Sequence, residues 1–533
     1  MNIVYNIPRK TTMNQEPLMM TFDFGTQSVR TCIFDKKGEC LALSKKKYDP
    51  AYYSSKPGYA EMDANYYYDC LCETTKAIVA EHPDLVKRCA GISLSCFRDT
   101  AVLLDKDNKL VRPTILWLDQ RMAKCEDKLP LLSRVAFSLV GMTEVINVNR
   151  RRTPLNWVKE NEPDNFNKVS KYIAISTYFI FRLTGNMKDS ASSYTGHYPM
   201  DYKKRQWYKK PEKHLKGMIF SQRKDQLADL VGGGELCGCI TKEAAKDTGL
   251  PEGMKLFAGG SDKSCETLGA GVINSSKLAI SLGTACTIET TTQKYVEPVT
   301  FLPAYPNVLP DLYNMDFQIY RGFWMVNWFL KEFGGRQIAD MMSEGPTPVD
   351  FDDHLDQIDP GCNGLLIQPY WGPLLDRPAV KGAMVGFSDS TTIYHIYKSL
   401  IEGICFELRA AKEMFEKKLH DTPFKEIRVS GGGARRDEIC QIIADVFNLP
   451  VYKLQTVEAS SLGAAISGFV AVKSFENPEQ AVANMVHPGK EFKPNPNNVK
   501  IYDEIFKNGY AKLYGSLKKV YKFIYEYQLR KMA

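Results

Sequence analysis

The chain has 533 residues, which is long for one hydrophobic core, so its length predicts two large domains or three of moderate size. Hydrophobic residues make up 44% of the chain and charged residues 25%, as is typical of a soluble globular protein. The net charge of +7 is small, and the lysines and arginines are scattered. This argues against nucleic-acid binding, which needs basic residues gathered on one face.

The fourteen cysteines lack the spacing of a disulfide framework, and the two C-x-C pairs lack companion His or Cys residues at zinc-like intervals. The N-terminal segment has no apolar run long enough for a signal peptide. The longest apolar stretch, 172–183, is too short to span a membrane and contains Arg182. We therefore expect a cytoplasmic protein with reduced thiols and no membrane partner.

The first predicted element is an apolar strand over 18–24, which ends in the sequence DFGT. A second strand over 31–34 and a third over 39–44 follow, joined by a hairpin. The turn between the first two strands leaves backbone N–H groups and hydroxyls free. Such a loop can hold a phosphate.

A helix over about 65–81 and a buried strand over 91–95 come next. This strand delivers Arg98 and Asp99 to its carboxyl end, where ligands collect in open α/β sheets. Arg98 can donate as a fork, and Asp99 can accept hydroxyl protons. A surface salt bridge explains the pair equally well, and the pattern alone leaves both interpretations open.

Residues 113–117 predict a strand, and 118–121 are expected to open a helix. Trp117 supplies an apolar wall, and Asp119 places another polar group near the same sheet edge. The tryptophan is equally compatible with plain core. Asn149, in a turn before a helix that extends to residue 162, is expected to reach the same pocket.

The segment 257–271, FAGGSDKSCETLGAG, pairs a Gly-Gly turn with the acidic residue Asp262. The two glycines let the backbone pass close to a ligand. Asp262 then lies at the start of the following helix, where a carboxylate can take a proton from a bound hydroxyl. An unshifted Asp, with a pKa near ~3.9, is ionised at neutral pH. Helix capping is the commoner role in this setting, so the segment alone leaves two interpretations.

From about residue 277 the initial pattern begins again, with a strand over 278–282, the turn Gly283-Thr284 and a strand over 286–291. Two copies of a strand and Gly-Thr turn, roughly 260 residues apart, imply two similar domains. We expect an N-terminal extension over 1–17, a first domain over 18–272 and a second domain over 273–533.

The second half also contains an amphipathic helix over 398–417, a strand over 427–430, a GGGA turn and a helix over 436–447. Glycines between a strand and a helix N-terminus let the backbone approach a flat or anionic ligand. Such turns also serve to pack a helix on a sheet, so GGGA alone does not establish a site.

The order of these motifs, DFGT, FRD, WLDQR, GGSDKS, SLGTA and SGGGARRD, resembles the FGGY family of carbohydrate kinases over about residues 18–527. The resemblance implies an α/β protein with two actin-like (ribonuclease H-like) domains and a nucleotide cleft between them. It implies ATP and Mg²⁺, with transfer of the ATP γ-phosphate to a primary hydroxyl of a small sugar or polyol.

The family's roles transfer to matching positions. Asp262 corresponds to the catalytic base, and Mg²⁺ is assigned to Asp23, through water, and to Asp262. The ATP-binding residues implied are Thr26, Gln27, Ser28, Arg30, Gly283, Thr284, Asn327, Gly432, Gly433, Ala434 and Asp437. The substrate-binding residues implied are Arg98, Asp99, Trp117, Asp119, Asn149, Asp262 and Lys263.

The resemblance does not point to a single substrate. Xylulokinases typically carry a Gln-Met-His-Gly type segment where this chain has CFRD at 96–99. An Arg followed by an acid looks more like glycerol kinases, but Asn149 stands where those carry Tyr, and the turn over 429–434 is closer to xylulokinase style. A ketopentose such as xylulose is our leading prediction, and glycerol or another polyol is the alternative.

An actin-like or chaperone-like ATP switch without a sugar substrate is the alternative from another class, and a degenerate kinase that senses sugar is a third. The partner expected is a small molecule, and a homodimer is left open.

Overall fold

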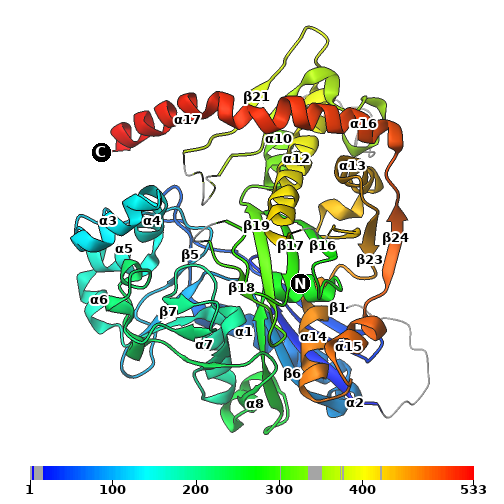
Figure 1. The fold of residues 1–533 in the computed structure, drawn as a ribbon. Coiled ribbons are helices and arrows are strands. Elements are labelled where there is room, and N and C mark those ends of the chain that lie inside the picture. The colour runs from blue at the N-terminus through cyan, green and yellow to red at the C-terminus, as the bar shows by residue number, and fades with distance from the viewer. Residues whose placement is uncertain are drawn as a thin grey trace, which may run out of the picture.

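Two seven-stranded mixed sheets, each covered by helices, organise the chain (Figure 1). The computed structural model describes residues 3–4, 16–299, 302–333, 351–372, 374, 377, 379–420 and 423–532. Across the first sheet the strands are β1 (Ile3–Val4), β4 (Cys40–Lys47), β3 (Ser28–Phe34), β2 (Leu18–Phe24), β6 (Cys89–Cys96), β15 (Lys255–Ser261) and β14 (Leu236–Cys239). Across the second they are β18 (Tyr305–Pro306), β19 (Tyr313–Ile319), β17 (Cys286–Thr292), β16 (Lys277–Leu282), β22 (Glu426–Ser430), β23 (Val451–Leu454) and β24 (Pro488–Phe492).

Both sheets share one pattern of strand directions. In the first sheet β2 pairs antiparallel with β3 and parallel with β6. In the second, β16 pairs antiparallel with β17 and parallel with β22. A further parallel strand and an antiparallel edge strand complete each sheet on the same side. The repeat predicted from the two Gly-Thr turns is therefore present in the topology.

The helices fall between the strands along the chain, and some of them follow one another directly. Those of the first half are α1 (Ala64–Glu81), α2 (Pro83–Arg88), α3 (Leu131–Leu139), α4 (Thr143–Arg152), α5 (Pro154–Asn161), α6 (Pro163–Lys168), α7 (Ile175–Thr184), α8 (Lys242–Thr248) and α9 (Asp262–Gly269). Those of the second half are α10 (Trp324–Phe333), α12 (Ile393–Leu419), α13 (Asp437–Phe447), α14 (Ala459–Ala471), α15 (Pro478–Met485), α16 (Pro496–Ile505) and α17 (Ala511–Met532).

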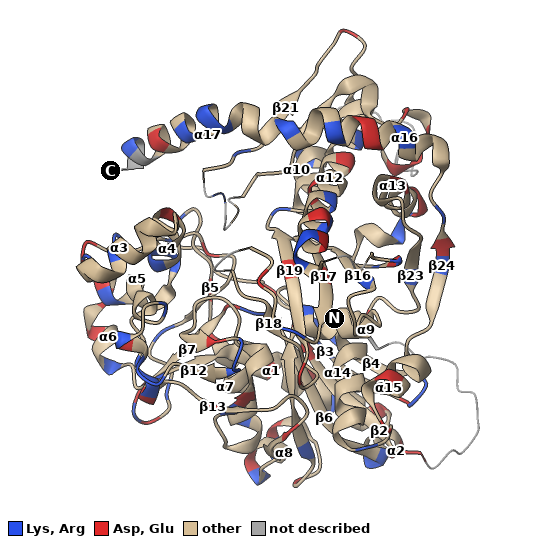
Figure 2. Cartoon of the chain, in the orientation of Figure 1, with Lys and Arg blue, Asp and Glu red and all other residues tan. Residues whose placement is uncertain are grey.

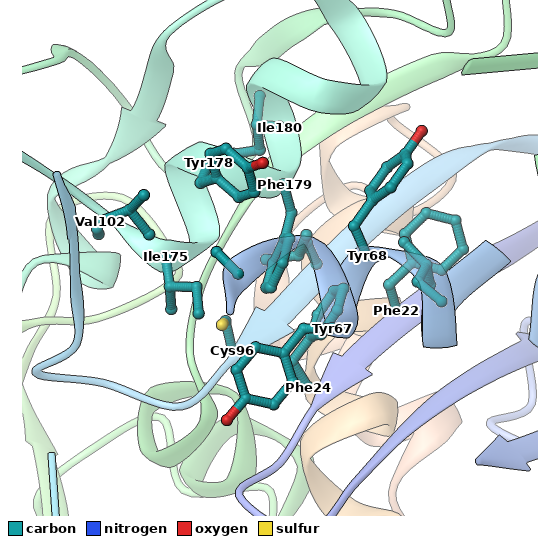
Figure 3. Packing of buried hydrophobic residues seen from close by; sticks show 14 of the residues in the cluster. Phe22, Phe24, Tyr67, Tyr68, Cys96, Val102, Ile175, Tyr178, Phe179 and Ile180 are labelled. Carbon is teal, nitrogen blue, oxygen red and sulfur yellow. The ribbon is translucent and has the colours of Figure 1, made fainter. Parts of the chain in front are cut away.

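The first core is rich in aromatic side chains (Figure 3). Phe24 at the end of β2 stacks on Phe179 of α7, with ring centroids 3.9 Å apart. Tyr67 of α1 meets Phe97 edge to face at 5.6 Å. Because every residue of β2 is buried, the strand is fixed from both faces. The turn that follows it is thus held on a rigid support.

Helix α14 belongs to the second half by sequence but packs on α9, β2 and β6 of the first (Figure 1). The two helices meet through glycines. A Cβ at Gly463 would lie 1.8 Å from the carbonyl oxygen of Cys265, and a Cβ at Gly269 would lie 2.0 Å from that of Ala459. Only residues without a Cβ permit this approach. Helix α14 lies after residue 272 in the sequence but packs on elements that lie before it. The predicted domain boundary at residue 272 therefore stays a prediction.

Most predicted elements of both sheets are present, but one region differs. Residues 118–121 are the end of a turn at 117–118 and irregular backbone rather than the start of a helix, and the preceding strand is reduced to β8 (Thr114–Ile115). The Asp119 carboxylate holds the turn by accepting the backbone N–H of Ala60 and of Arg121. Asn149 lies within α4 rather than in a turn. Of the predicted N-terminal extension, residues 1–2 and 5–15 lie outside the described residues.

Acidic and basic side chains are interspersed over both halves (Figure 2). All fourteen cysteines are free. Among the helices of the described ranges, none is long and apolar enough to cross a membrane.

Candidate active site

A cavity of about 1150 Å³ is lined by residues from both halves of the chain. The first half contributes the acidic residues Asp23 and Asp262, and the second contributes Gly283 and Thr284. The two Gly-Thr turns therefore face one space, although they are far apart in sequence. Of the predicted ATP-binding residues, those in the cavity lining are Thr26, Gln27, Ser28, Arg30, Gly283 and Thr284.

Asp262 is the first residue of α9, directly after β15. The helix is capped by Ser261, whose hydroxyl accepts the N–H of Ser264 at 3.3 Å. The capping interpretation of Asp262 is therefore wrong, because the preceding residue fills that role. The Asp262 carboxylate instead lines the cavity and accepts the N–H of Lys263 at 2.8 Å.

Burial raises the pKa of Asp262 from its ordinary value to about 6, while the positive charges of Lys263 and Arg98 act in the opposite direction. The expectation of an unshifted carboxylate is corrected by this environment. A carboxylate whose pKa lies near the working pH is a better proton acceptor than one of pKa ~3.9. A carboxylate in this environment can accept a proton from a bound hydroxyl.

Glu266, which the motif analysis did not select, lies one turn after Asp262 on α9 and lines the same cavity. Its carboxylate accepts a hydrogen bond from the Lys263 ammonium at 2.6 Å. The same ammonium donates a hydrogen bond to the Ser281 hydroxyl of β16 at 3.0 Å. Although burial acts to raise it, Lys263 holds the pKa of Glu266 below its usual value. The i, i+4 spacing from Asp262 was the available sequence signal.

Asp23, near the end of β2, is tied to the positive charge of Arg30. Arg30 donates to Asp23 at 3.2 Å and to Glu458 at 2.7 Å. Burial raises the pKa of Asp23, and Arg30 acts to lower it. Ser461 of α14 also donates to Asp23, at 3.4 Å. The carboxylate is therefore oriented by residues from both halves.

The first Gly-Thr turn is closed by a hydrogen bond from the N–H of Gly25 to the carbonyl of Ser28 at 3.0 Å. Trp117 donates its indole N–H to the Thr26 hydroxyl at 3.0 Å. Trp117 thus has a polar contact with the predicted phosphate turn, in addition to the apolar wall that the sequence suggested. In the second turn, the carbonyl of Gly283 accepts the N–H of Phe323.

Arg98 and Asp99 are adjacent in sequence, but they contact different parts of the protein. Arg98 forms an ion pair with Asp316 of β19 and donates to Gln318 at 3.0 Å. Asp99 accepts the backbone N–H of His197 at 3.0 Å and faces its ring nitrogen Nδ1 at 2.9 Å. Neither forms the surface salt bridge considered from the sequence. Asp316 and His197 both line the cavity, and the motifs did not select either.

The carboxylate of Asp119 makes its hydrogen bonds to other groups of the protein. Its two oxygens accept four hydrogen bonds, three from Arg121 and one from Ala60. A carboxylate has about four acceptor positions, so none is left for a sugar hydroxyl. Asp119 does line the cavity, and the substrate-binding role predicted for it stays a prediction. Asn149 lines the cavity and donates to the carbonyl of Val145 at 2.8 Å.

The other predicted ATP-binding residues lie outside the cavity lining, namely Asn327, Gly432, Gly433, Ala434 and Asp437. Asp437 is partly exposed and pairs with Lys453 at 2.5 Å and with Lys490. These lysines hold the pKa of Asp437 below its usual value. Gly432 has nothing within 4 Å of a Cβ position, so the turn offers open space to a flat ligand.

The donor set suits a nucleotide with a magnesium ion. Hard oxygen ligands and one or two carboxylates are what Mg²⁺ uses alongside phosphates, and Asp23 and Asp262 provide them in one cavity. In the described ranges no group of three or more His, Cys, Asp or Glu residues is close enough to hold a metal. A metal shared with phosphates and water does not need such a group.

The N-terminal domain of the FGGY family of carbohydrate kinases matches residues 18–269, and its C-terminal domain matches residues 278–472. The chain belongs to this family. It is 29% identical over 497 residues to a xylulose kinase of Lactococcus lactis subsp. lactis (strain IL1403). The match covers 92% of this chain and 95% of the relative. It is 25% identical over 496 residues to a gluconokinase of Bacillus subtilis (strain 168), with 91% and 93% covered.

A crystal structure of ligand-bound xylulose kinase from Lactobacillus acidophilus shares the fold, with a TM-score of 0.78 at 23% identity, and covers 95% of this chain and all of its own. The resemblance inferred from the motifs is confirmed, as are the two-domain α/β fold and sugar kinase activity. The activity of this family implies ATP as the phosphate donor.

Proposed function

We propose that the chain transfers the γ-phosphate of ATP to a primary hydroxyl of a small sugar or polyol, with a ketopentose such as xylulose as the leading candidate. The observation that carries this proposal is the carboxylate of Asp262, which faces a cavity shared by the two Gly-Thr turns and has a pKa raised to about 6. Glycerol or another polyol is the alternative substrate.

In this proposal Asp262 accepts the proton of the attacking hydroxyl, and the two turns orient the phosphates through backbone N–H groups and hydroxyls. Phosphoryl transfer needs mainly alignment and charge neutralisation, so one carboxylate with such donors suffices. Mg²⁺, held by Asp23 through water and by Asp262, would supply neutralisation of phosphate charge. Closure of the two halves over the cavity would exclude water as a competing nucleophile.

The substrate is the finer part of the proposal. A xylulose kinase is among the relatives with the higher identity, which favours a ketose, whereas a gluconokinase at 25% identity would favour a sugar acid. A site that hydrogen-bonds particular hydroxyls discriminates strongly between such compounds. Cavity residues that accept or donate to hydroxyls are therefore the features to test.

The test is ATP consumption by the purified chain with Mg²⁺, against ketoses, aldoses, polyols and sugar acids. We expect a ketopentose to stimulate ATP consumption most, with a sugar phosphate as the product. Stimulation by glycerol alone would support the polyol alternative. If no compound stimulates consumption while ATP still binds, the proposed function fails and an ATP switch is the better description.

A further inference from the structure

One wall of the cavity carries an unusual concentration of buried polar atoms without partners. Within the described residues, the side-chain oxygens of Thr195 and Tyr202 and the Nε2 of His197 are buried and have no hydrogen-bond partner, and all three residues line the cavity. Such atoms are rare in folded proteins because each costs about 1–3 kcal/mol of lost solvation. Three within the eight-residue loop 195–202 indicate a surface built for a ligand.

His197 is held firmly within this loop. The Asp99 carboxylate accepts a hydrogen bond from the backbone N–H of His197 at 3.0 Å, and it lies 2.9 Å from the ring nitrogen Nδ1. Gln222 donates to its carbonyl at 2.9 Å, and Phe220 meets the ring edge to face. The fit is close because residue 196 is a glycine with φ of +91°, at which a Cβ would lie 2.2 Å from the Asp99 carboxylate. The imidazole is thus fixed in orientation.

The segment that leads into this loop lies beside β15, the strand that precedes the proposed base. Ser190 donates to the carbonyl of Gly259 at 2.6 Å, and a Cβ at Gly260 would contact Ser192. Asp262 follows Gly260 by two residues. The Arg98 charge also acts on Asp262, and Arg98 precedes Asp99. The imidazole and the proposed base therefore belong to the same end of the cavity.

In the neutral form of the imidazole, which carries a single ring proton, donation from Nδ1–H to the Asp99 carboxylate fixes the tautomer. Nε2 is then an acceptor. We infer that His197 is a specificity-determining residue whose Nε2 accepts a hydrogen bond from a hydroxyl of the sugar, with Asp99 as its positioning residue. This rests on the proposed function and makes a hydroxyl donor of the sugar the group that His197 recognises.

The test compares the wild-type protein with His197→Asn. The Asn amide retains a donor near the position of Nδ1 and the backbone bond to Asp99, but it lacks Nε2. We expect kcat/KM for the accepted sugar to fall roughly 10-fold or more, as for a lost hydrogen bond that leaves a partner unpaired. The KM for ATP and the melting temperature should be unchanged. His214→Asn, at a cavity histidine that stacks on Tyr208, is the matched control.

Single-deoxy analogues of the sugar give the decisive comparison, by kinetics and by calorimetric binding. For one analogue the difference between wild type and His197→Asn should vanish, which identifies the hydroxyl. An equal loss with every analogue would overturn the inference, because it would mean that His197 acts through the fold alone. A loss confined to sugar acids would overturn the acceptor role. Absence of turnover by the wild type would count against the proposed function, and the binding comparison would still test His197.

Discussion

The two sheets have the same strand order, but the ends of their central strands carry different chemistry. In β2 the next-to-last residue is Asp23, and in β16 the corresponding residue is Ser281. Strand β6 leads to Arg98 and Asp99, whereas β22 leads to three glycines, 431–433. At these strand ends the first sheet places charged side chains in the cavity lining, whereas the second places the small residues Ser281 and Gly283 there and adds a charge only farther along, from Asp316 of β19. A duplicated fold can divide the work of alignment and reaction between its copies.

The contrast continues in the helices that follow the last parallel strands, α9 after β15 and α14 after β23. They contact each other reciprocally, Gly463 against Cys265 and Gly269 against Ala459. Asp262 opens the first helix, and its carbonyl accepts the hydroxyl of Ser460 at 3.3 Å near the start of the second. Catalysis is therefore predicted to depend on the first copy, and the position of its base on the second.

The strongest way to break this comparison is to remove the proposed base. Asp262→Asn should lower turnover by about 10² to 10⁴ or more, as expected on loss of a general base. ATP binding should be largely retained. Glu458→Gln, next to the start of α14, is the matched change in the second copy and should cost far less. Steady-state kinetics with the accepted sugar measure both variants, and normal turnover by Asp262→Asn would contradict the assignment.

The pH profile tests the same residue without mutation. The base must be ionised, so kcat/KM should decline as pH falls through about 6, the raised pKa of Asp262. The same shift opposes stability at neutral pH, because a folded-state pKa above the unfolded value favours the protonated form. Asp262→Asn should therefore melt no lower than wild type at pH 7. A profile that stays flat from pH 7 down to pH 5 would argue against this base.

A smaller effect is expected at the contact between the two helices. Gly463→Ala introduces a Cβ that would overlap the carbonyl of Cys265, so α14 and α9 must separate. Overpacking of this kind typically costs about 1–3 kcal/mol of unfolding free energy. Denaturant unfolding measures it, and Gly515→Ala, with nothing within 4 Å of its Cβ, serves as control. Equal stability of the two variants would show that the helix contact is not tight.

The smallest effect is expected at the edge of the second sheet. Asp437 pairs with Lys453 and Lys490 on a partly exposed surface, where such pairs contribute less than about 1 kcal/mol. Asp437→Asn should change the KM for ATP by no more than a few-fold and leave turnover intact. Loss of turnover comparable to that of Asp262→Asn would remove the proposed division between the sheets.

Sequence reasoning succeeded where the determinants are local. Hydrophobic runs predicted β2, β6 and β16, and the glycine and aspartate spacing indicated the helix that begins at Asp262. It failed at 118–121. There the Asp119 side chain accepts a hydrogen bond from the backbone N–H of Arg121, and this local bond competes with helix formation. Local pattern carries no information on which residues become neighbours through folding.

The contacts of the cavity are of that second kind. The partner of Arg98 is Asp316, and its other acceptor, Gln318, is 220 positions away in the sequence. His197 has significance only because Asp99 reaches it. The raised pKa of Asp262 arises from burial, which the motif does not specify. Glu266 alone could have been found earlier, from its spacing on α9.

Helix α14 also has a consequence for synthesis. Its apolar residues Leu462, Ile466 and Phe469 cover Met19 and Phe34 of the first sheet. During translation the strands of that sheet leave the ribosome long before residue 459 is synthesised. The apolar surface that α14 covers is therefore exposed to solvent in the nascent first half. Late completion of this kind makes the emerging polypeptide a natural client for chaperones, and a gene fragment that stops at residue 272 should yield aggregates.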